Sequence, residues 1–483
     1  MTNNAPPSAR VQPSQTTSYD DVQLRTLAAG TLMPGFSGTR VPDWIVAALG
    51  SGLASVCIYG PNITSPEQLT GLMRQLRAAS PSALLTLDEE GGDVTRLHYL
   101  TGSDQPGNAV LGRLDDVSVT TAAAAQIADE LNALGFNLNL APDADVNSTA
   151  SNPVIGVRSF GAEATLVARH TAAWVSGLQG AGVAACAKHF PGHGDTATDS
   201  HLALPTIEVD RATLAERELA PFAAAIAAGV ASVMTSHIMV PALDAENPAT
   251  FSPRILNDLL RRDMGFSGAI VTDALDMAGA SAVTGIETAA VRALAAGADL
   301  LCLGSETSPE RFEAIIEAIV VAVRAGRLPL ARLQDAVRRT ALLAADYPAA
   351  GPTAAGRTPD MPSNTAAFEL SDAARRWLAL PAEPALVQID SEANMAVGGV
   401  PWGPAAVQAA TRLADLGAQA KVALVGRNLD AGHSIFQVAE ALRADGREVI
   451  VVECGWPRGG ADIVTFGASR AVSAALVGLL APG

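Results

Sequence analysis

Residues 183–201, VAACAKHFPGHGDTATDSH, decide how the chain is expected to fold, because an apolar run passes directly into a cluster of polar side chains. The run at 183–187 is apolar at consecutive positions, which is typical of a strand buried on both faces of a parallel sheet. The fourteen residues at 188–201 hold three of the seven histidines in the chain, with two aspartates, a lysine and three turn-forming residues. The pattern predicts a strand that ends in a loop carrying catalytic side chains.

The same order of an apolar segment, a polar or glycine end and an amphipathic stretch recurs from residue 31 to residue 304. Alternating strands and helices predict a parallel sheet, and eight such units close into a (β/α)8 TIM barrel. A doubly wound open sheet is the alternative. Helices are expected at stretches such as 119–134, 164–180 and 211–228. The eight expected strands lie at 31–36, 53–60, 83–90, 136–146, 184–190, 231–237, 268–274 and 298–304.

Polar side chains at the ends of these segments favour the barrel over the open sheet. Barrel enzymes gather their active-site residues at the carboxyl ends of the strands. Five such residues fall at or just past a predicted strand end: Asp88, Asp143, His189, His237 and Asp273.

The length of the chain suggests more than one domain. Residues 1–22 are expected to form a flexible lead-in, and residues 23–345 the catalytic barrel, which a helical segment at 309–345 closes. Residues 346–365, rich in Pro, Gly, Ala and Thr, read as a linker. Residues 366–483 are expected to form a smaller α/β domain, a three-layer sandwich with strands at 384–390, 420–426, 447–455 and 461–469 and helices at 434–445 and 470–480.

Charge and composition limit the classes of partner. Hydrophobic residues make up 49% of the chain and charged residues 17%, which is typical of a globular protein. The net charge of −17 argues against nucleic acids and anionic membranes, since both favour a basic surface. With no run of about 18 apolar residues and no apolar signal segment at the start, we expect a cytoplasmic protein. Four widely spaced cysteines, Cys57, Cys186, Cys302 and Cys454, are expected to be buried free thiols.

Two acidic positions and one arginine stand out on the expected catalytic face. Asp88 ends the run at 83–90, where a carboxylate can accept hydrogen bonds from two vicinal hydroxyl groups. Its neighbours Glu89 and Glu90 are interpreted as acids at a helix N-terminus, where negative charge is favoured. Arg158 lies in a loop marked by glycine and proline and can donate a fork of hydrogen bonds. Asp273 ends an apolar strand, where an unpaired carboxylate is costly without a function.

The turn Gly426-Arg427-Asn428 in the second domain is a weaker candidate. It could hold a phosphate, but the chain has no full Gly-x-Gly-x-x-Gly fingerprint there. We interpret it as an ordinary loop between a strand and a helix.

Together these stretches resemble glycoside hydrolase family 3, and within it the β-N-acetylglucosaminidase branch, over about residues 25–345. The family's Lys-His-Phe-Pro-Gly-His-Gly pattern followed by Asp-Ser-His is present at 188–194 and 199–201. Its Asp-x-Glu-Gly-Gly-x-Val-x-Arg pattern is present at 88–96. The Asp-Ser-His element separates this branch from the β-glucosidases, which take an acid/base glutamate from the second domain. The second domain here is short and matches no catalytic motif.

The resemblance implies a retaining glycosidase that removes terminal β-N-acetylglucosamine without a metal or organic cofactor. Asp273 would be the nucleophile, and His201 the acid/base, supported by Asp199 as in a catalytic triad. The residues expected to bind the hydroxyl groups of the terminal sugar are Asp88, Arg96, Arg158, Lys188 and His189. The partner would be a small glycan or muropeptide, as in cell-wall recycling.

Three alternatives stay open at this point. A phosphorylase could use the same scaffold, because a neutral histidine repels phosphate less than a glutamate does. A catalytically dead sugar-binding protein is a further alternative, although Asp199, His201 and Asp273 are all present. A metal-dependent barrel hydrolase could use the polar loop, whose possible ligands are His189, His193, Asp195, Asp199 and His201.

Overall fold

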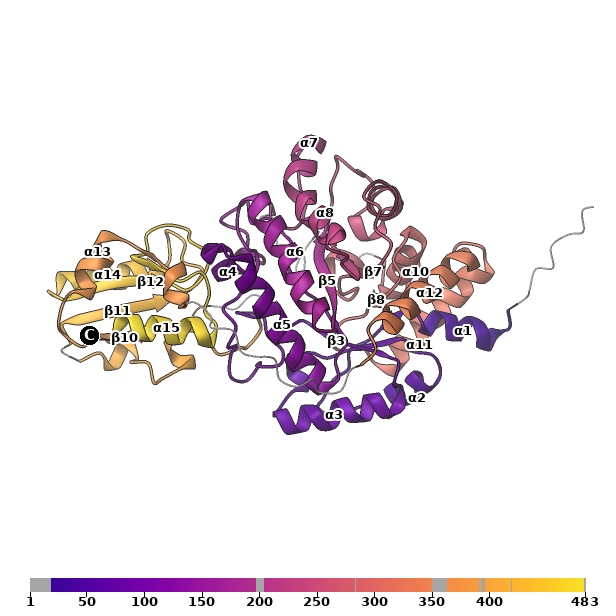
Figure 1. Ribbon diagram of the computed structural model, residues 1–483, viewed down its shortest axis with the longest axis horizontal. Helices are drawn as coiled ribbons and strands as arrows, with labels where there is room; N and C mark the ends of the chain where they lie inside the picture. The colour runs from indigo at the N-terminus through magenta and orange to yellow at the C-terminus, as the bar shows by residue number, and fades with distance from the viewer. Residues whose placement is uncertain are drawn as a thin grey trace, which may run out of the picture.

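The computed structural model describes residues 19–196, 204–282, 284–349, 363–389, 391, 396–417 and 419–481. Two parts follow each other along the longest axis of the molecule (Figure 1). The larger part holds the indigo-to-orange elements, and the smaller part holds the orange-to-yellow elements after residue 363. Among the described helices, none is long and apolar enough to cross a membrane.

The larger part is the predicted barrel. Strands β2 to β7 form a parallel sheet in chain order, and β1 pairs with β8 in parallel. A bridge between Val271 and Leu300 joins β7 to β8, and the amide of Cys57 donates to Pro34 across β1 and β2 at 3.0 Å, which closes the ring. The strands are β1 (Leu32–Met33), β2 (Ser55–Cys57), β3 (Leu84–Leu87), β4 (Leu138–Asn139), β5 (Ala184–Phe190), β6 (Ser232–Thr235), β7 (Ala269–Thr272) and β8 (Leu301–Cys302).

All eight predicted strands are confirmed, but only β5 has the predicted length. The other seven predicted segments ran past the strands, and their extra residues leave the hydrogen-bonded ladder to form the loops. The strand residues themselves are fully buried, because helices cover the outer face of the barrel and side chains fill its inside.

Local signals in the sequence begin and end the covering helices. Ser65 caps α3 through its hydroxyl, with Pro66 at the first position, and Gly135 ends α5 with a φ of 88°. The helices of the barrel are α1 (Asp21–Ala29), α2 (Asp43–Gly50), α3 (Pro66–Ala79), α4 (Asn108–Leu114), α5 (Val117–Leu134), α6 (Ala164–Gly180), α7 (Arg211–Thr213), α8 (Leu219–Ala227), α9 (Ala278–Ser281), α10 (Ile286–Ala296), α11 (Pro309–Arg324) and α12 (Leu330–Asp346).

Two predicted helices are divided in the structure. The helix expected at 211–228 contains a π-helical segment, Leu214–Glu218, between α7 and α8. The segment expected at 309–345 divides into α11 and α12, because Gly326 takes a φ of 71° and Pro329 precedes the second helix.

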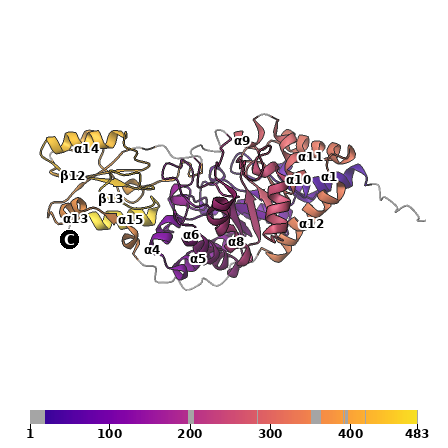
Figure 2. The same cartoon turned by 90° about the horizontal axis from the view of Figure 1, so that it is seen from above.

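The smaller part is a three-layer α/β domain, as predicted. Its parallel strands are β10 (Ala385–Gln388), β11 (Lys421–Gly426), β12 (Glu448–Glu453) and β13 (Ile463–Val464), with the antiparallel edge strand β9 (Glu369–Leu370) beside β13. Figure 2 shows α14 (Ser434–Ala444) on one face, and α13 (Asp372–Leu378) with α15 (Arg470–Leu480) on the other. The sequence pattern missed β9 and α13, which are both short. The core of this domain extends into the barrel part through Ala109 and Val110 of α4.

The boundaries drawn from the sequence stay predictions. Helix α1 begins at Asp21, just before the end of the expected lead-in, and α12 runs to Asp346. Most of the expected linker at 346–365 lies outside the described residues.

The four cysteines are buried and free, which confirms their prediction. Burial raises the pKa of Cys186, Cys302 and Cys454 to about 12. These thiols therefore stay protonated and serve as small apolar core residues.

The turn at 426–428 agrees with its interpretation as an ordinary loop. The carboxylate of Glu453 accepts hydrogen bonds from the amides of Asn428 and Leu429 at 2.9 and 2.6 Å, and from Gly455 at 2.6 Å. The amide groups that would cradle a phosphate are therefore occupied by a side chain of the protein itself.

Candidate active site

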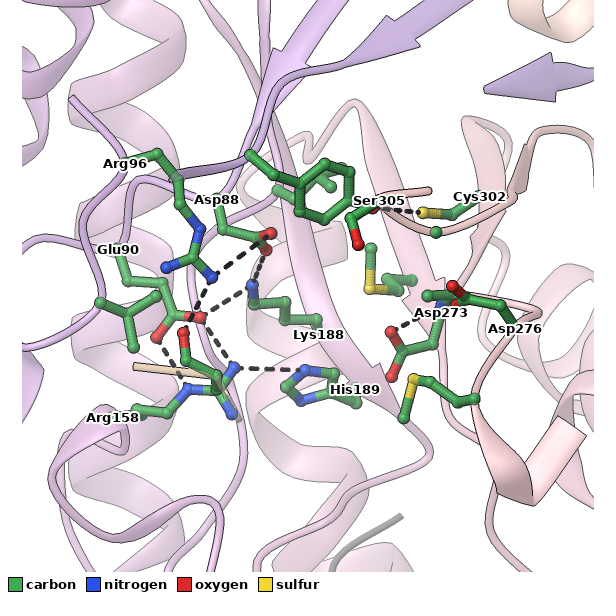
Figure 3. A pocket seen from close by; sticks show the side chains of 18 of the residues that line it. Asp88, Glu90, Arg96, Arg158, Lys188, His189, Asp273, Asp276, Cys302 and Ser305 are labelled. Carbon is green, nitrogen blue, oxygen red and sulfur yellow. Dashed lines mark hydrogen bonds and ion pairs between the residues drawn. The ribbon is translucent and has the colours of Figure 1, made fainter. Parts of the chain in front are cut away.

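A cavity of about 580 Å³ opens where the barrel strands end. Figure 3 shows two groups of side chains facing each other across it: Asp88, Arg96 and Arg158 on one side, Asp273 on the other, with Lys188 and His189 between them. Six of the eight predicted site residues therefore lie around one space. The other two, Asp199 and His201, lie outside the described residues.

Lys188 stands at the centre of the cavity wall, at the end of β5. Its side chain is only 2% exposed, and its Nζ lies 2.6 Å from Oδ1 of Asp88 and 2.8 Å from Oε1 of Glu90. Burial alone would lower the pKa of Lys188, but the two carboxylates outweigh it and hold the pKa above its ordinary value. The lysine is therefore charged and fixed in place at the cavity wall.

Glu90 joins this lysine to Arg158. The guanidinium donates to both carboxylate oxygens, from Nε to Oε2 at 3.0 Å and from Nη2 to Oε1 at 2.7 Å. Burial would raise the pKa of Glu90, but Arg158 and then Lys188 outweigh it and hold the pKa well below its ordinary value. One buried carboxylate thus orients two of the expected sugar-binding cations.

The interpretation of Glu89 and Glu90 as acids of a helix N-terminus is wrong. The next helix, α4, begins only at Asn108. Gly91 and Gly92 take φ values of 74° and 63°, and this turn leaves both acids in the barrel interior. Oε2 of Glu89 accepts hydrogen bonds from the hydroxyl of Thr95 and from the amides of Arg96 and Leu97, at 2.8 to 2.9 Å. Glu89 therefore shapes the loop that presents Arg96.

His189 is held by Asp145, which the sequence analysis did not select. The ring Nδ1 lies 2.7 Å from Oδ2 of Asp145, and Nη2 of Arg158 lies 3.4 Å from Nε2. A guanidinium only donates, so Nε2 accepts and Nδ1 carries the hydrogen. Burial first and Arg158 second lower the pKa of His189 to about 4, so the ring is neutral at pH 7.

A second buried acid, Asp143, stands beside Asp145. Its Oδ1 accepts the amide of Asp145 at 2.9 Å, and its Oδ2 lies 3.7 Å from Nη2 of Arg158 with no hydrogen-bond partner among the described residues. Burial, together with the mutual repulsion of the two acids, raises the pKa of Asp143. Burial likewise raises the pKa of Asp145. The pair therefore retains a proton at pH values where an exposed pair would be fully ionised.

Asp143, Asp145 and His189 also have the donor types of a metal site, with one atom of each within 4.8 Å of the others. The surrounding charges disfavour a cation there. Arg158 already supplies positive charge next to Asp143, and His189 uses Nδ1 for its hydrogen bond to Asp145. The geometry therefore favours a hydrogen-bonded group that orients His189.

Asp273 follows β7 and lines the opposite side of the cavity. Its Oδ1 accepts the amide of Ala274 at 2.8 Å, and its own amide donates to Thr235 of β6 at 3.2 Å. These bonds fix the carboxylate at the strand end. The lining on this side is mixed, with apolar Met234 and Met277 and polar Asp276 and Ser305.

Two further histidines predicted near this face do not line the cavity. His193 is buried, with Nδ1 2.8 Å from the hydroxyl of Thr196, and burial followed by His189 lowers its pKa to about 3. His237 is buried between the hydroxyl of Thr250 and the carbonyl of Ala274, at 2.9 and 3.0 Å.

The sequence contained a signal for the two missed acids. Glu90 lies two positions after Asp88, and Asp145 lies two positions after Asp143. Alternate residues of an extended segment point to the same side, so each missed acid accompanies an acid that was selected. The spacing of two positions between acids at a strand end could therefore have predicted that Glu90 and Asp145 belong to the site.

The sequence of this chain is similar to those of known proteins. The sequence profile described as the glycosyl hydrolase family 3 N-terminal domain matches residues 42–343. A β-hexosaminidase A of Pseudoalteromonas piscicida is 34% identical over 322 residues, which are 61% of this chain and 54% of that protein. This chain therefore matches only about half the length of that relative.

Two solved structures are similar as well. One is a glycoside hydrolase family 3 β-N-acetylglucosaminidase from a Paenibacillus species, with a TM-score of 0.83 and 31% identity over 95% of this chain and 96% of that one. The other is a β-N-acetylhexosaminidase from Beutenbergia cavernae, with a TM-score of 0.61 and 31% identity over 68% of this chain and 99% of that one. These matches confirm the resemblance drawn from the motifs.

Proposed function

This chain belongs to glycosyl hydrolase family 3, and we propose that it is a β-N-acetylhexosaminidase that removes terminal non-reducing β-N-acetylglucosamine with retention of configuration. One observation carries the proposal. The carboxylate of Asp273 faces a fixed set of hydroxyl-binding groups across a cavity of about 580 Å³. A single sugar ring placed between them has its anomeric carbon at the carboxylate and its hydroxyl groups at Asp88, Lys188 and Arg158.

The first chemical step forms a covalent glycosyl-enzyme. The carboxylate of Asp273 attacks the anomeric carbon, the bond from that carbon to the leaving oxygen breaks, and His201 donates its proton to that oxygen. In the second step His201 takes a proton from water, the water oxygen attacks the anomeric carbon, and the bond to Asp273 breaks. The roles of His201 and of its supporting Asp199 rest on the family motif, since both lie outside the described residues.

The sugar-binding side of the cavity is preorganised by its ion pairs. Asp88, Lys188, Glu90 and Arg158 form a chain of contacts from 2.6 to 3.0 Å that needs no rearrangement when substrate binds. His189 lies beside this chain, where its Nε2 accepts from Arg158 at 3.4 Å. Fixed donors and acceptors lower the cost of orienting the sugar for attack.

The charges of the cavity favour water over phosphate as the second substrate. Each of the cations Arg96, Arg158 and Lys188 has a carboxylate partner, Asp88 or Glu90, within 4.0 Å. An incoming phosphate would meet these carboxylates as well as the cations. Asp273 and Asp276 also line the cavity, so the described lining residues hold four carboxylates against three cations, which supports a hydrolase.

Hydrolysis of aryl glycosides tests the proposal. The panel contains the nitrophenyl β-N-acetylglucosaminide, β-glucoside and β-xyloside, each with and without phosphate and with and without a chelator. We expect the highest kcat/KM for the N-acetylglucosaminide, free sugar as product and no effect of chelator. A higher kcat/KM for the glucoside would contradict the proposed specificity. Formation of a sugar phosphate would make the protein a phosphorylase, and loss of activity with chelator would support a metal-dependent hydrolase.

The natural substrate and the cellular setting are finer parts of the proposal. We propose a muropeptide or chitobiose-type glycan in the cytoplasm, as a step of cell-wall recycling. Digestion of purified muropeptides and of chitobiose, followed by mass spectrometry, separates the two substrates. Fractionation of cells with an antibody against the protein tests the location.

The domain boundaries are proposed as drawn from the sequence, with a barrel at 23–345, a linker at 346–365 and a second domain at 366–483. Limited proteolysis with fragment mass analysis tests them. Cleavage should concentrate at 346–365, and first cuts inside α12 or β11 would contradict the boundaries.

A further inference from the structure

The second domain contributes directly to the cavity wall. Ala396 lines the cavity, although it lies beyond β10 of the second domain. Its carbonyl accepts a hydrogen bond from Nη2 of Arg96 at 2.8 Å, and the same nitrogen lies 4.0 Å from Oδ2 of Asp88. The arginine that is expected to bind the sugar is thus held between a barrel carboxylate and a backbone carbonyl of the second domain.

The segment that carries Ala396 is packed firmly on the barrel. Val397 and Val400 are buried in one cluster with Val94 of the active-site loop, against the ring of Tyr99. The amide of Gly399 donates to the hydroxyl of Tyr99 at 3.3 Å. Side-chain packing and a hydrogen bond therefore fix this wall relative to the loop at 88–99.

A second set of contacts fixes the domain to the same loop from its other side. The amide of Ala468 donates to Oδ1 of Asp93 at 2.7 Å. Nη2 of Arg458 donates to the carbonyl of Asn152, in the loop that also carries Arg158, at 3.3 Å. The second domain therefore contacts the two barrel loops that carry Arg96 and Arg158.

The position of Ala396 in the cavity determines whether it contacts the terminal sugar or the leaving group. Arg96 and Asp88 lie on the side of the cavity opposite Asp273 (Figure 3). The proposed function places the anomeric carbon of the terminal sugar at Asp273 and its far hydroxyl groups at Asp88 and Arg96. Ala396 therefore lies next to the glycone, the sugar that is removed, and not next to the leaving group.

We propose that Ala396 is a specificity-determining residue, through which the second domain closes the glycone end of the cavity and limits it to one unsubstituted terminal sugar. This inference rests on the proposed glycosidase function. The Beutenbergia structure covers 68% of this chain along 99% of its own length, so a similar protein lacks about a third of the chain described here. A methyl side chain at 396 leaves room for the ring, and a larger one occupies that room.

The test compares two substitutions of alanine by tryptophan in the full chain. Ala396→Trp places a large ring at the glycone end, while the matched control Ala441→Trp places it on the exposed surface of α14. We expect KM to rise roughly 10- to 100-fold for Ala396→Trp with little change in kcat, because steric overlap weakens substrate and transition state alike. The inhibition constant of free N-acetylglucosamine should rise by the same factor. The control should match the wild type.

Substrates with different leaving groups show whether Ala396 lies at the terminal sugar or at the leaving group. A wall at the glycone affects an aryl glycoside and a disaccharide by the same factor, because both share the terminal sugar. An increase in KM for the disaccharide alone would place Ala396 at the leaving group and overturn the proposal. An unchanged KM for both substrates would overturn it as well.

A second variant, which adds no volume, tests whether misfolding explains the effect of Ala396→Trp. Tyr99→Phe removes only the hydroxyl that accepts the amide of Gly399. It should raise KM a few-fold in the same direction for both substrates, with thermal unfolding unchanged within about 1 °C. No rise in Tyr99→Phe, together with a loss of thermal stability in Ala396→Trp, would show that the tryptophan acts only through folding. Wild-type protein inactive on every N-acetylglucosaminide would instead overturn the proposed function, and the glycone wall with it.

Discussion

Oδ2 of Asp145 lies 2.7 Å from Nδ1 of His189, and Oδ1 of the same carboxylate accepts the amide of His193 at 2.7 Å. One buried acid therefore orients the imidazole and also anchors the turn that begins four residues later. That turn leads toward the predicted acid/base at 201. We therefore predict that Asp145 is a positioning residue, which affects substrate binding through His189.

We first predict the effect of removing this acid. Asp145→Ala should raise KM more than it lowers kcat, and kcat/KM should fall roughly 10- to 100-fold, because a hydrogen bond to a charged group is worth about 1.5–3 kcal/mol. Asp145→Asn keeps one acceptor oxygen and should recover part of the loss. Steady-state kinetics on an aryl N-acetylglucosaminide measure both variants. Equal losses in the alanine and asparagine variants would argue against an orienting hydrogen bond.

The second prediction concerns stability and pH. Burial and then Asp145 raise the pKa of Asp143 to about 8 from an ordinary value of 3.8. The folded protein therefore retains a proton that the unfolded chain releases, so this carboxyl group costs stability as pH rises from about 4 to 8. Asp143→Asn cannot ionise at this position and should lose less stability across that range, measured by urea unfolding at several pH values.

The control for this experiment is an exposed acid. Asp258 forms a surface pair with Arg262, and Asp258→Asn should follow the wild-type pH curve. If the curve of Asp143→Asn also runs parallel to that of the wild type, Asp143 does not hold its proton in the folded state.

Glu90 is the subject of the third prediction. Glu90→Gln keeps the shape of the side chain but leaves Arg158 and Lys188 with one carboxylate fewer. Breaking a buried ion pair costs about 3–5 kcal/mol, so the free energy of unfolding should fall by that amount, and kcat/KM should fall with it. Urea unfolding measures the first effect. The matched control, Glu317→Gln, breaks an exposed pair with Arg25 and should leave both quantities close to wild type.

The fourth prediction assigns the nucleophile. Asp273→Ala removes the group that forms the covalent intermediate, so activity should be lost for good and poor leaving groups alike. Hydrolysis of a dinitrophenyl glycoside and of a disaccharide measures the loss. A variant that keeps appreciable activity on the activated substrate would mean that Asp273 is not the nucleophile.

The fifth prediction assigns the acid/base by its dependence on the leaving group. His201→Ala removes the proton donor, which a nitrophenolate does not need but a sugar alkoxide does. A disaccharide should lose roughly 10²–10⁴-fold in rate, while an aryl glycoside should show a burst of nitrophenol followed by a stall. Azide, which needs no deprotonation, should relieve the stall and give the β-glycosyl azide.

A different result would contradict the assignment of His201 as the acid/base. Equal losses on both substrates, without rescue by azide, would move the acid/base role to another residue. His193 is the first candidate, although it does not line the cavity. Its pKa, lowered to about 3 by burial and then by His189, makes it a poor proton donor near neutral pH.

Much of the fold followed from local patterns in the sequence. Strands buried on both faces leave continuous apolar runs, so the eight barrel strands and the four parallel strands of the second domain were predicted at their positions. Their ends were not, because hydrogen bonding to neighbouring strands decides where a ladder stops. The short elements β9 and α13 were missed for the same reason, since an edge strand of two residues has almost no pattern of its own.

The sequence by itself determined which residues lie at the strand ends, and so placed Asp88, Lys188 and Asp273 around one space. Only the tertiary structure decided what each charge is paired with. The local sequence pattern of an acid that follows a strand is the same whether the acid begins a helix or is buried. Glu90 forms buried ion pairs because Arg158 and Lys188, which lie 68 and 98 positions later, pack against it. Ala396 joins the same cavity from the other domain. Contacts between such distant positions depend on how the elements pack, and no local pattern contains that information.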